Sequence, residues 1–117
     1  MQVRQRVRAR ASELNFSLVD QTKLVTAASE LARNALVHGG GGRAWLEVLS
    51  SGGRRGLQVT FEDEGPGIPD VNEALRDGFS TAGGLGLGLG GARRLVNEFR
   101  ISSEVGRGTR VAITRWV

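Results

Sequence analysis

The chain has 117 residues, a net charge of +4 and no cysteine. This length fits one domain with a single hydrophobic core, and the lack of cysteine excludes disulfide bonds and thiolate metal sites. No apolar run approaches the roughly 20 residues of a membrane-spanning helix, and no leader peptide precedes the first expected helix. We therefore expect a single domain over residues 1–117, located in the cytoplasm and without a membrane partner.

The first expected element is a helix over residues 2–14, and a longer helix follows from Asp20, its candidate N-cap, to His38. The first helix carries the net charge, because without its arginines the basic and acidic residues balance at 12 each. Apolar residues recur on it at helical spacing, and no aromatic residue lies among the arginines. These features favour a solvated face of a core-packed helix over a nucleic-acid surface. The arginines are Arg4, Arg6, Arg8 and Arg10, and the apolar residues are Val3, Val7, Ala11 and Leu14.

The rest of the chain predicts a sheet with two further helices. Two segments that alternate apolar and polar residues flank a glycine-rich turn, which indicates a β-hairpin. Helices gathered beside a mainly antiparallel, mixed sheet indicate a two-layer α/β sandwich, with the helices on one face, rather than alternating βαβ units. The expected ranges are strands at 43–50 and 56–64, helices at 70–76 and 90–98, and strands at 99–105 and 109–117.

Four short motifs follow one another along this pattern. Glu30 and Asn34 lie four residues apart on the long helix, so they project from one face and can reach a single ion or phosphate. Asp63 ends a strand and is followed by Gly65 and Gly67, which let the backbone approach a flat ligand. A glycine-rich segment and a Gly-Thr pair complete the set. The motifs are SELARNA at 29–35, DEGPG at 63–67, GGLGLGLGG at 83–91 and GRGT at 106–109.

The glycine-rich segment is interpreted as a lid rather than a plain linker. Amides in such a segment can surround phosphate oxygens, as nests and helix amino termini do. It is not a P-loop, because no lysine follows the glycines. Three leucines interrupt it, and we interpret them as anchors of a closed lid or as partner contacts. The glycines are Gly83, Gly84, Gly86, Gly88, Gly90 and Gly91, and the leucines are Leu85, Leu87 and Leu89.

In their order, the four motifs resemble those of the GHKL ATPase and kinase family. Several longer phrases are similar to the RsbT-type serine/threonine-protein kinases, relatives of the anti-sigma-factor kinases, over nearly the whole chain. The resemblance implies the family's ATP-binding sandwich, the Bergerat-type fold. The phrases are SELARN, EDEGPGIPD, DGFSTAGGLGLGL and RLVNEF.

The same resemblance implies a role for each motif residue. Glu30 would be the general base, and Asn34 would be the Mg²⁺ ligand, which agrees with the preference of Mg²⁺ for oxygen. The carboxylate of Asp63 would accept a hydrogen bond from the adenine amino group, and Gly67 would pack close to the base. Thr109 would support the adenine with its hydroxyl, often through water.

The implied function is an ATP- and Mg²⁺-dependent kinase that phosphorylates a serine or threonine of a STAS-domain protein. The setting would be the stressosome or a related partner-switching module of bacteria, in which the released kinase activates a phosphatase. Two alternatives stay open: a nucleotide-gated anti-sigma factor or adaptor with little or no phosphoryl transfer, and an ATPase in which water replaces the protein hydroxyl. Glu30 favours the kinase, because binding alone requires no base.

The start of the chain departs from the chains that it resembles, which begin with a strand before the first helix. Here Met1 lies almost directly on the expected helix. A shortened chain would expose a sheet edge, which favours a homodimer or pairing with a partner. A misassigned start gives the same sequence, so both interpretations stay open.

Overall fold

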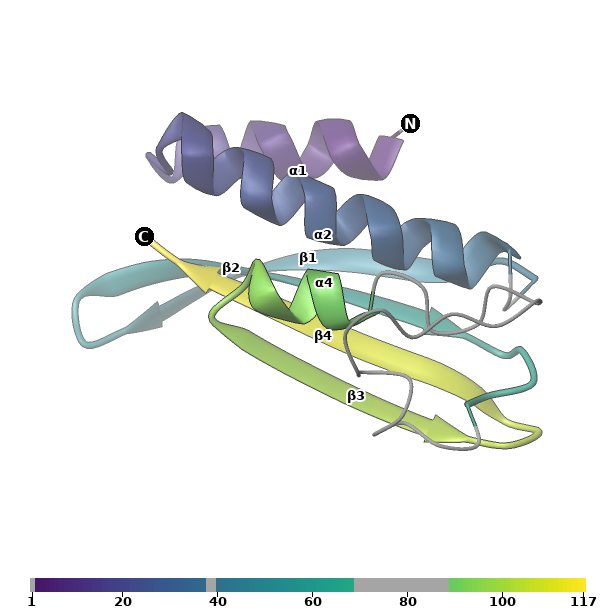
Figure 1. The fold of residues 1–117 in the computed structure, drawn as a ribbon. Helices are drawn as coiled ribbons and strands as arrows, with labels where there is room; N and C mark the ends of the chain where they lie inside the picture. Colours follow the sequence, from purple (N-terminus) through teal and green to yellow (C-terminus); the bar gives the residue numbers. More distant parts are fainter. Residues whose placement is uncertain (1, 38–39, 69–88) are drawn as a thin grey trace.

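The computed structural model describes residues 2–37, 40–68 and 89–117 as helices packed on one face of a sheet (Figure 1). The expected helix at 70–76 lies outside the described residues, as do Gly83, Gly84, Gly86 and Gly88. None of the described helices is long and apolar enough to cross a membrane. The elements are α1 (Gln2–Glu13), α2 (Leu18–Val37), β1 (Gly42–Ser51), β2 (Arg54–Asp63), α4 (Leu89–Arg94), β3 (Glu98–Glu104) and β4 (Gly108–Trp116).

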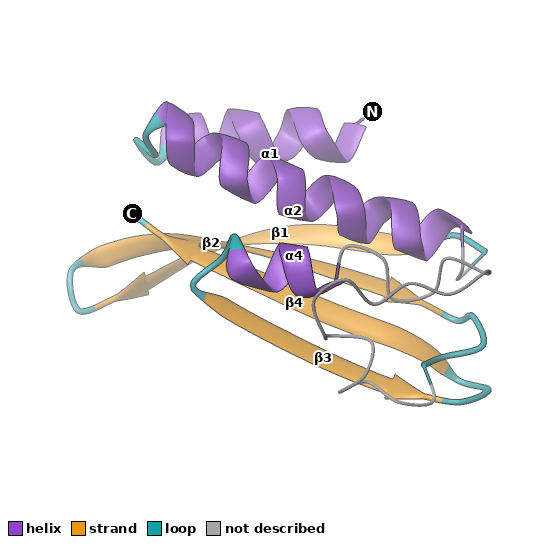
Figure 2. Cartoon of the chain, in the orientation of Figure 1, coloured by secondary structure: helices purple, strands orange, loops and turns teal. Residues whose placement is uncertain are grey.

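The four strands in the described part of the chain form one sheet in the order β1-β2-β4-β3, and every neighbouring pair is antiparallel. Figure 2 shows α1, α2 and α4 in one layer and the strands in the other. The predicted two-layer α/β sandwich with helices on one face is confirmed. A mixed sheet would need a parallel pair, and the strands described here contain none.

The hydrophobic core lies between the two layers. In the sheet, Val59 pairs with Leu46 on one side and with Ile113 on the other. Because side chains alternate between faces along a strand, every second residue of each strand then faces the helices. Leu24 of α2 and Val7 of α1 are fully buried against this face.

The amphipathic character predicted for α1 is confirmed. Val7 and Ala11 are fully buried and Leu14 is almost so. The arginines of this helix are all exposed, so the positive charge of the segment lies on its solvated face.

The turn between α1 and α2 is formed by a C-cap that ends α1 and an N-cap that begins α2. Asn15 adopts a left-handed conformation with φ of 66°, and Phe16 N–H donates to the Ala11 carbonyl at 3.0 Å, which together form a Schellman C-cap. Ser17 then caps α2, because its Oγ accepts the Asp20 N–H at 3.1 Å. The prediction that Asp20 is the N-cap was therefore wrong: α2 begins at Leu18, so Asp20 lies within the first turn of the helix, and its carboxylate is engaged elsewhere.

That carboxylate binds Arg115, which connects the start of α2 to the sheet. Arg115 Nη2 lies 2.7 Å from Asp20 Oδ1, and Arg115 Nη1 donates to the Leu95 carbonyl at 3.0 Å. The hydrogen bond from Arg115 lowers the pKa of Asp20 below its ordinary value of 3.8. One guanidinium thus ties α2 to β4 and to the segment that follows α4.

We expect the Asp20–Arg115 pair to make stability depend on acidity. Because the folded-state pKa of Asp20 is depressed, its contribution is present above pH 3.8 and is lost as the pH falls through the lowered pKa. The stability advantage of the wild type over Asp20→Asn should therefore shrink over the acidic range, as the pH falls from above 3.8 through the lowered pKa. Urea unfolding midpoints of both proteins across this range measure the effect, and a constant difference would contradict it.

The helix before β3 is shorter than expected. The spacing of Leu95 and Val96 predicted a helix to residue 98, but α4 ends at Arg94. Asn97 N–H already donates to the Thr114 carbonyl at 2.9 Å, so the chain has joined the sheet by that point. Pairing with β4 therefore overrides the helical pattern of this segment.

Candidate functional site

The candidate site lies where β2 ends and β4 begins, on the helix-covered face. Asp63 pairs with Thr109, and Thr109 pairs with Ser103 of β3. By strand alternation, these three residues share the face of Phe61 and Val111, one step beyond the core. A carboxylate and two hydroxyls thus form a polar row at the edge of an apolar floor.

The loop after β2 is joined to the β3–β4 hairpin by hydrogen bonds. Asp63 Oδ1 accepts the Gly65 N–H at 2.9 Å, which tightens the start of the loop as an Asx turn. Gly106 N–H donates to the Pro66 carbonyl at 2.8 Å. Ile68 N–H donates to Ser103 Oγ at 2.7 Å. The DEGPG and GRGT motifs therefore form one structural unit.

Two glycines allow this close approach. Gly67 has φ of 80°, and a Cβ there would overlap the backbone of Glu104. Gly108 has φ of 110°, and a Cβ there would overlap the backbone at Asp63 and Glu64. In this structure, Gly67 is needed for backbone contact with the hairpin, a reason that the sequence did not reveal.

We predict that Gly108→Ala destabilises the fold much more than Gly106→Ala. Both glycines have positive φ, but a Cβ at Gly106 meets nothing within 4 Å. Backbone strain alone should cost about 1 kcal/mol in Gly106→Ala, whereas the added overlap should raise the cost to about 3 kcal/mol in Gly108→Ala. Chemical unfolding of the two variants tests this, and equal losses would show that the contact with Asp63 is unimportant.

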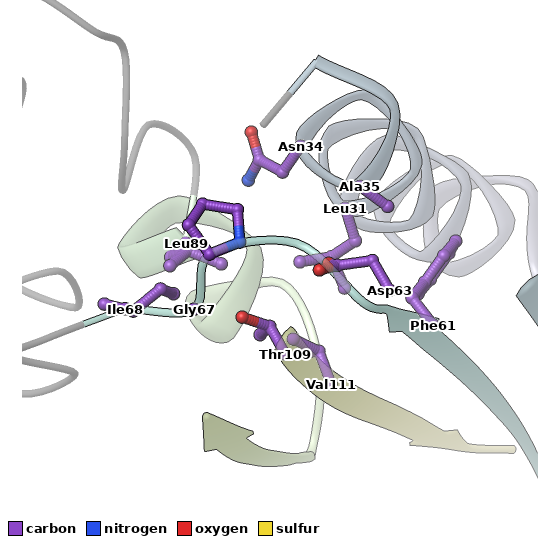
Figure 3. Close-up of a pocket in the computed structure, with 11 residues that line it drawn as sticks. Leu31, Asn34, Ala35, Phe61, Asp63, Gly67, Ile68, Leu89, Thr109 and Val111 are labelled. Carbon is purple, nitrogen blue, oxygen red and sulfur yellow. The ribbon is translucent and has the colours of Figure 1, made fainter. Parts of the chain in front are cut away.

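A small cavity opens above the polar row, between α2 and the sheet (Figure 3). Asp63 and Thr109 lie at the strand ends with their oxygens turned toward it, and Asn34 approaches from α2. The cavity has a volume of about 50 Å³, whereas a single benzene ring occupies a cavity of roughly 150 Å³. A purine base requires a wider pocket than this. The lining residues are Leu31, Asn34, Ala35, Phe61, Asp63, Pro66, Gly67, Ile68, Leu89, Thr109 and Val111.

Among the predicted site residues with a described position, four meet at this cavity: Asn34, Asp63, Gly67 and Thr109. Glu30 lies one helical turn before Asn34 on α2, is partly exposed and does not line the cavity. Gly65 shapes the loop through its bond to Asp63.

The predicted lid is described only at its end. Leu89 is 3% exposed, belongs to α4 and lines the cavity, while Gly90 and Gly91 lie in the same helix. Leu85 and Leu87 lie outside the described residues.

The donor set fits a nucleotide better than a protein-held metal. Asp63 offers a carboxylate and Thr109 a hydroxyl beside the apolar side chains of the cavity, which suits the edge and faces of a base. Within the described ranges, no three His, Cys, Asp or Glu side chains gather closely enough to hold a metal ion. A single amide at Asn34 suits Mg²⁺, because this ion is commonly bound by few protein ligands together with substrate phosphates and water.

Ser103 was missed at the sequence level. It contacts both motifs through one hydroxyl, with Ile68 N–H at 2.7 Å and Thr109 Oγ1 at 2.8 Å. The available signal was the hairpin itself, because a turn at 105–107 places residue 103 opposite residue 109. No motif marks this serine.

A second, larger groove lies on the other side of α2, along the edge strand β1. Its volume is about 780 Å³, and α1 forms its opposite wall with Arg6 and Arg10. It shares Ala35 and Phe61 with the smaller cavity. Of the predicted site residues that the structure describes, none lines it.

Comparison with known proteins identifies the family of the chain. Residues 19–116 match the family described as histidine kinase-, DNA gyrase B-, and HSP90-like ATPases. The chain is 47% identical to serine/threonine-protein kinase RsbT of Bacillus subtilis (strain 168) over 107 residues, which cover 92% of this chain and 80% of that protein. It is 31% identical to the anti-sigma F factor of Geobacillus kaustophilus (strain HTA426), covering 95% of this chain and 80% of that protein.

A solved structure shares the fold. The mycobacterial sensor histidine kinase MprB superposes with a TM-score of 0.57, covering 82% of this chain and 71% of that chain. At 22% sequence identity, this likeness concerns the arrangement of helices and strands alone.

Proposed function

The chain belongs to the family of histidine kinase-, DNA gyrase B- and HSP90-like ATPases, and from this premise we propose that it phosphorylates a serine or threonine of a STAS-domain protein in a bacterial partner-switching module. The enzyme class, an ATP-dependent protein kinase of the RsbT type, is shown by the 47% identity over most of the chain. The STAS-domain acceptor, the stressosome setting and the need for Mg²⁺ are the proposal.

The observation that carries the proposal is the convergence of two distant motifs at one cavity. Asp63 and Thr109 are register partners on neighbouring strands, and both line it. We infer that the Asp63 carboxylate accepts the adenine amino hydrogen bond and that the Thr109 hydroxyl supports the same edge. Gly67 also lines the cavity and adds no side chain in the way of the base.

Catalysis would then use the exposed side of α2. ATP supplies the γ-phosphoryl group, and Mg²⁺ offsets the charge of its phosphates. Asn34 would bind the ion through its amide oxygen. Glu30, on the same helix face one turn away, would orient the acceptor hydroxyl and take its proton as the phosphoryl group is transferred. Its partial exposure leaves it within reach of a protein substrate.

The predicted lid would enclose the phosphates. Gly83, Gly84, Gly86 and Gly88 are its proposed binding residues, through their backbone amides. We propose that the kinase acts in the cytoplasm and that, once released from its acceptor, it activates a phosphatase.

A second candidate function rests on the anti-sigma F factor relatives, at 31% identity over 95% of this chain. In that case the nucleotide would control the capture of a partner, with little or no phosphoryl transfer. A homodimer or a paired partner strand would use the edge strand β1.

The experiment that tests the proposal is transfer of label from γ-labelled ATP to a panel of STAS-domain proteins, with Mg²⁺ and with EDTA. We expect label on a serine or threonine of an acceptor, and its loss when the metal is chelated. ATP binding without transfer to any acceptor would favour the nucleotide-gated binding protein. Absence of ATP binding would contradict both functions.

A further inference from the structure

Ser103 connects the two halves of the candidate base site through a single hydroxyl. Its Oγ accepts the Ile68 N–H at 2.7 Å and lies 3.1 Å from the Gly108 carbonyl oxygen, to which it donates. The same Oγ lies 2.8 Å from Thr109 Oγ1. Ser103 is partly buried and does not line the cavity, whereas Thr109 does. Any effect of Ser103 on a ligand must therefore pass through a bonded neighbour that lines the cavity, Thr109 or Ile68.

Counting hydrogens determines the direction of these bonds. A serine hydroxyl has one hydrogen and can accept two hydrogen bonds. The Gly108 carbonyl can only accept, and the Ile68 amide can only donate. All three contacts are satisfied together only if Ser103 donates to Gly108 and Thr109 donates to Ser103. In that arrangement, the hydrogen of Thr109 is used, and its oxygen presents lone pairs to the cavity.

We propose that Ser103 is a positioning residue for base selection, because it holds the Thr109 hydroxyl as a hydrogen-bond acceptor. The ionised carboxylate of Asp63 is an acceptor as well. At the C6 position an amino group donates to such a pair, whereas a carbonyl only accepts. Hypoxanthine has a donor at the neighbouring N1, but in the same pose its C6 carbonyl would face two acceptors. The pair thus selects adenine over hypoxanthine. This inference rests on the proposed function, in which the cavity binds the base of ATP.

The test compares the affinities of ATP and ITP, which differ in the group at C6 and in the hydrogen on N1, by calorimetry with Mg²⁺. We expect the wild type to prefer ATP. In Ser103→Ala, the preference should fall about tenfold, the size expected for one hydrogen bond, because the freed Thr109 hydrogen can donate to the hypoxanthine carbonyl. Ser103→Thr keeps the hydroxyl and should keep the preference. Ser102→Ala, at an exposed neighbour on the opposite face of β3, is the matched control.

The outcomes separate this inference from the proposed function. Equal weakening of ATP and ITP in Ser103→Ala would indicate a merely structural role and overturn the inference. An unchanged preference with intact ATP binding would also overturn it, and would leave the proposed function standing. Failure of the wild type to bind ATP would overturn both. If Ser103→Ala does not fold, Ser103→Cys is the second variant, since a thiol bonds weakly and should lower the preference in the same direction.

Discussion

Glu30→Gln should abolish phosphoryl transfer while leaving ATP binding intact. Glutamine keeps the length and the oxygen of the side chain but cannot take a proton from the acceptor hydroxyl. Loss of a general base lowers the rate by about 10²–10⁴-fold, and Glu30 does not line the cavity, so the affinity for nucleotide should change little. Single-turnover label transfer and calorimetric ATP binding on the same preparation measure the two effects.

The matched control for this variant is Glu13→Gln. Glu13 is an exposed glutamate at the end of α1 and forms a surface ion pair with Arg10, at 3.5 Å. The Glu13→Gln variant should transfer phosphate at the wild-type rate. If Glu30→Gln transferred phosphate as fast as Glu13→Gln, Glu30 would not be the general base.

Asp63→Ala should weaken ATP binding by about 100-fold, the size expected for a lost hydrogen bond to a charged group. The change also removes the acceptor of the Gly65 N–H, which shapes the loop beside the cavity. Within the described parts of the chain, Gly65 is the only donor to this carboxylate, through Oδ1. We therefore assign the second oxygen, Oδ2, as the atom that accepts the hydrogen bond from the adenine ring's amino group. Calorimetry with ATP and Mg²⁺ measures the loss.

Glu64→Ala is the natural comparison, because Glu64 is the next acid in the chain and is exposed. It should bind ATP as the wild type does. If Asp63→Ala and Glu64→Ala bound ATP with equal affinity, Asp63 would not be part of the ATP-binding site. Both variants should unfold cooperatively at similar urea concentrations for this comparison to hold.

Much of the fold was predictable because its signals are local. Val7 and Ala11 lie at helical spacing and are fully buried, and the hairpin turn at Gly52 and Gly53 was expected from its glycines, which have φ of 57° and 81°. The order of the motifs also indicated the superfamily, and the longer phrases indicated the RsbT-type subfamily and with it the enzyme class, all confirmed by comparison.

Other features depend on contacts between distant segments. The sequence suggested that Asp63 and Thr109 act together, but their direct pairing arises because β2 neighbours β4 rather than β3. Ser17 and Asp20 are both good capping residues, and the choice of Ser17 reflects the engagement of Asp20 by Arg115 of β4. Ser103 gains its importance only from the loop that packs on the hairpin. No local pattern encodes these contacts.

The roles of the site residues stay predictions, and one measurement tests them together. It is a crystal structure of the chain with Mg²⁺ and a non-hydrolysable ATP analogue. We expect the base in a widened cavity between α2 and the ends of β2 and β4, with its amino group bonded to Asp63 and with Asn34 at the ion. A nucleotide bound in the 780 Å³ groove between α1 and β1, or a base turned away from Asp63 and Thr109, would contradict the account.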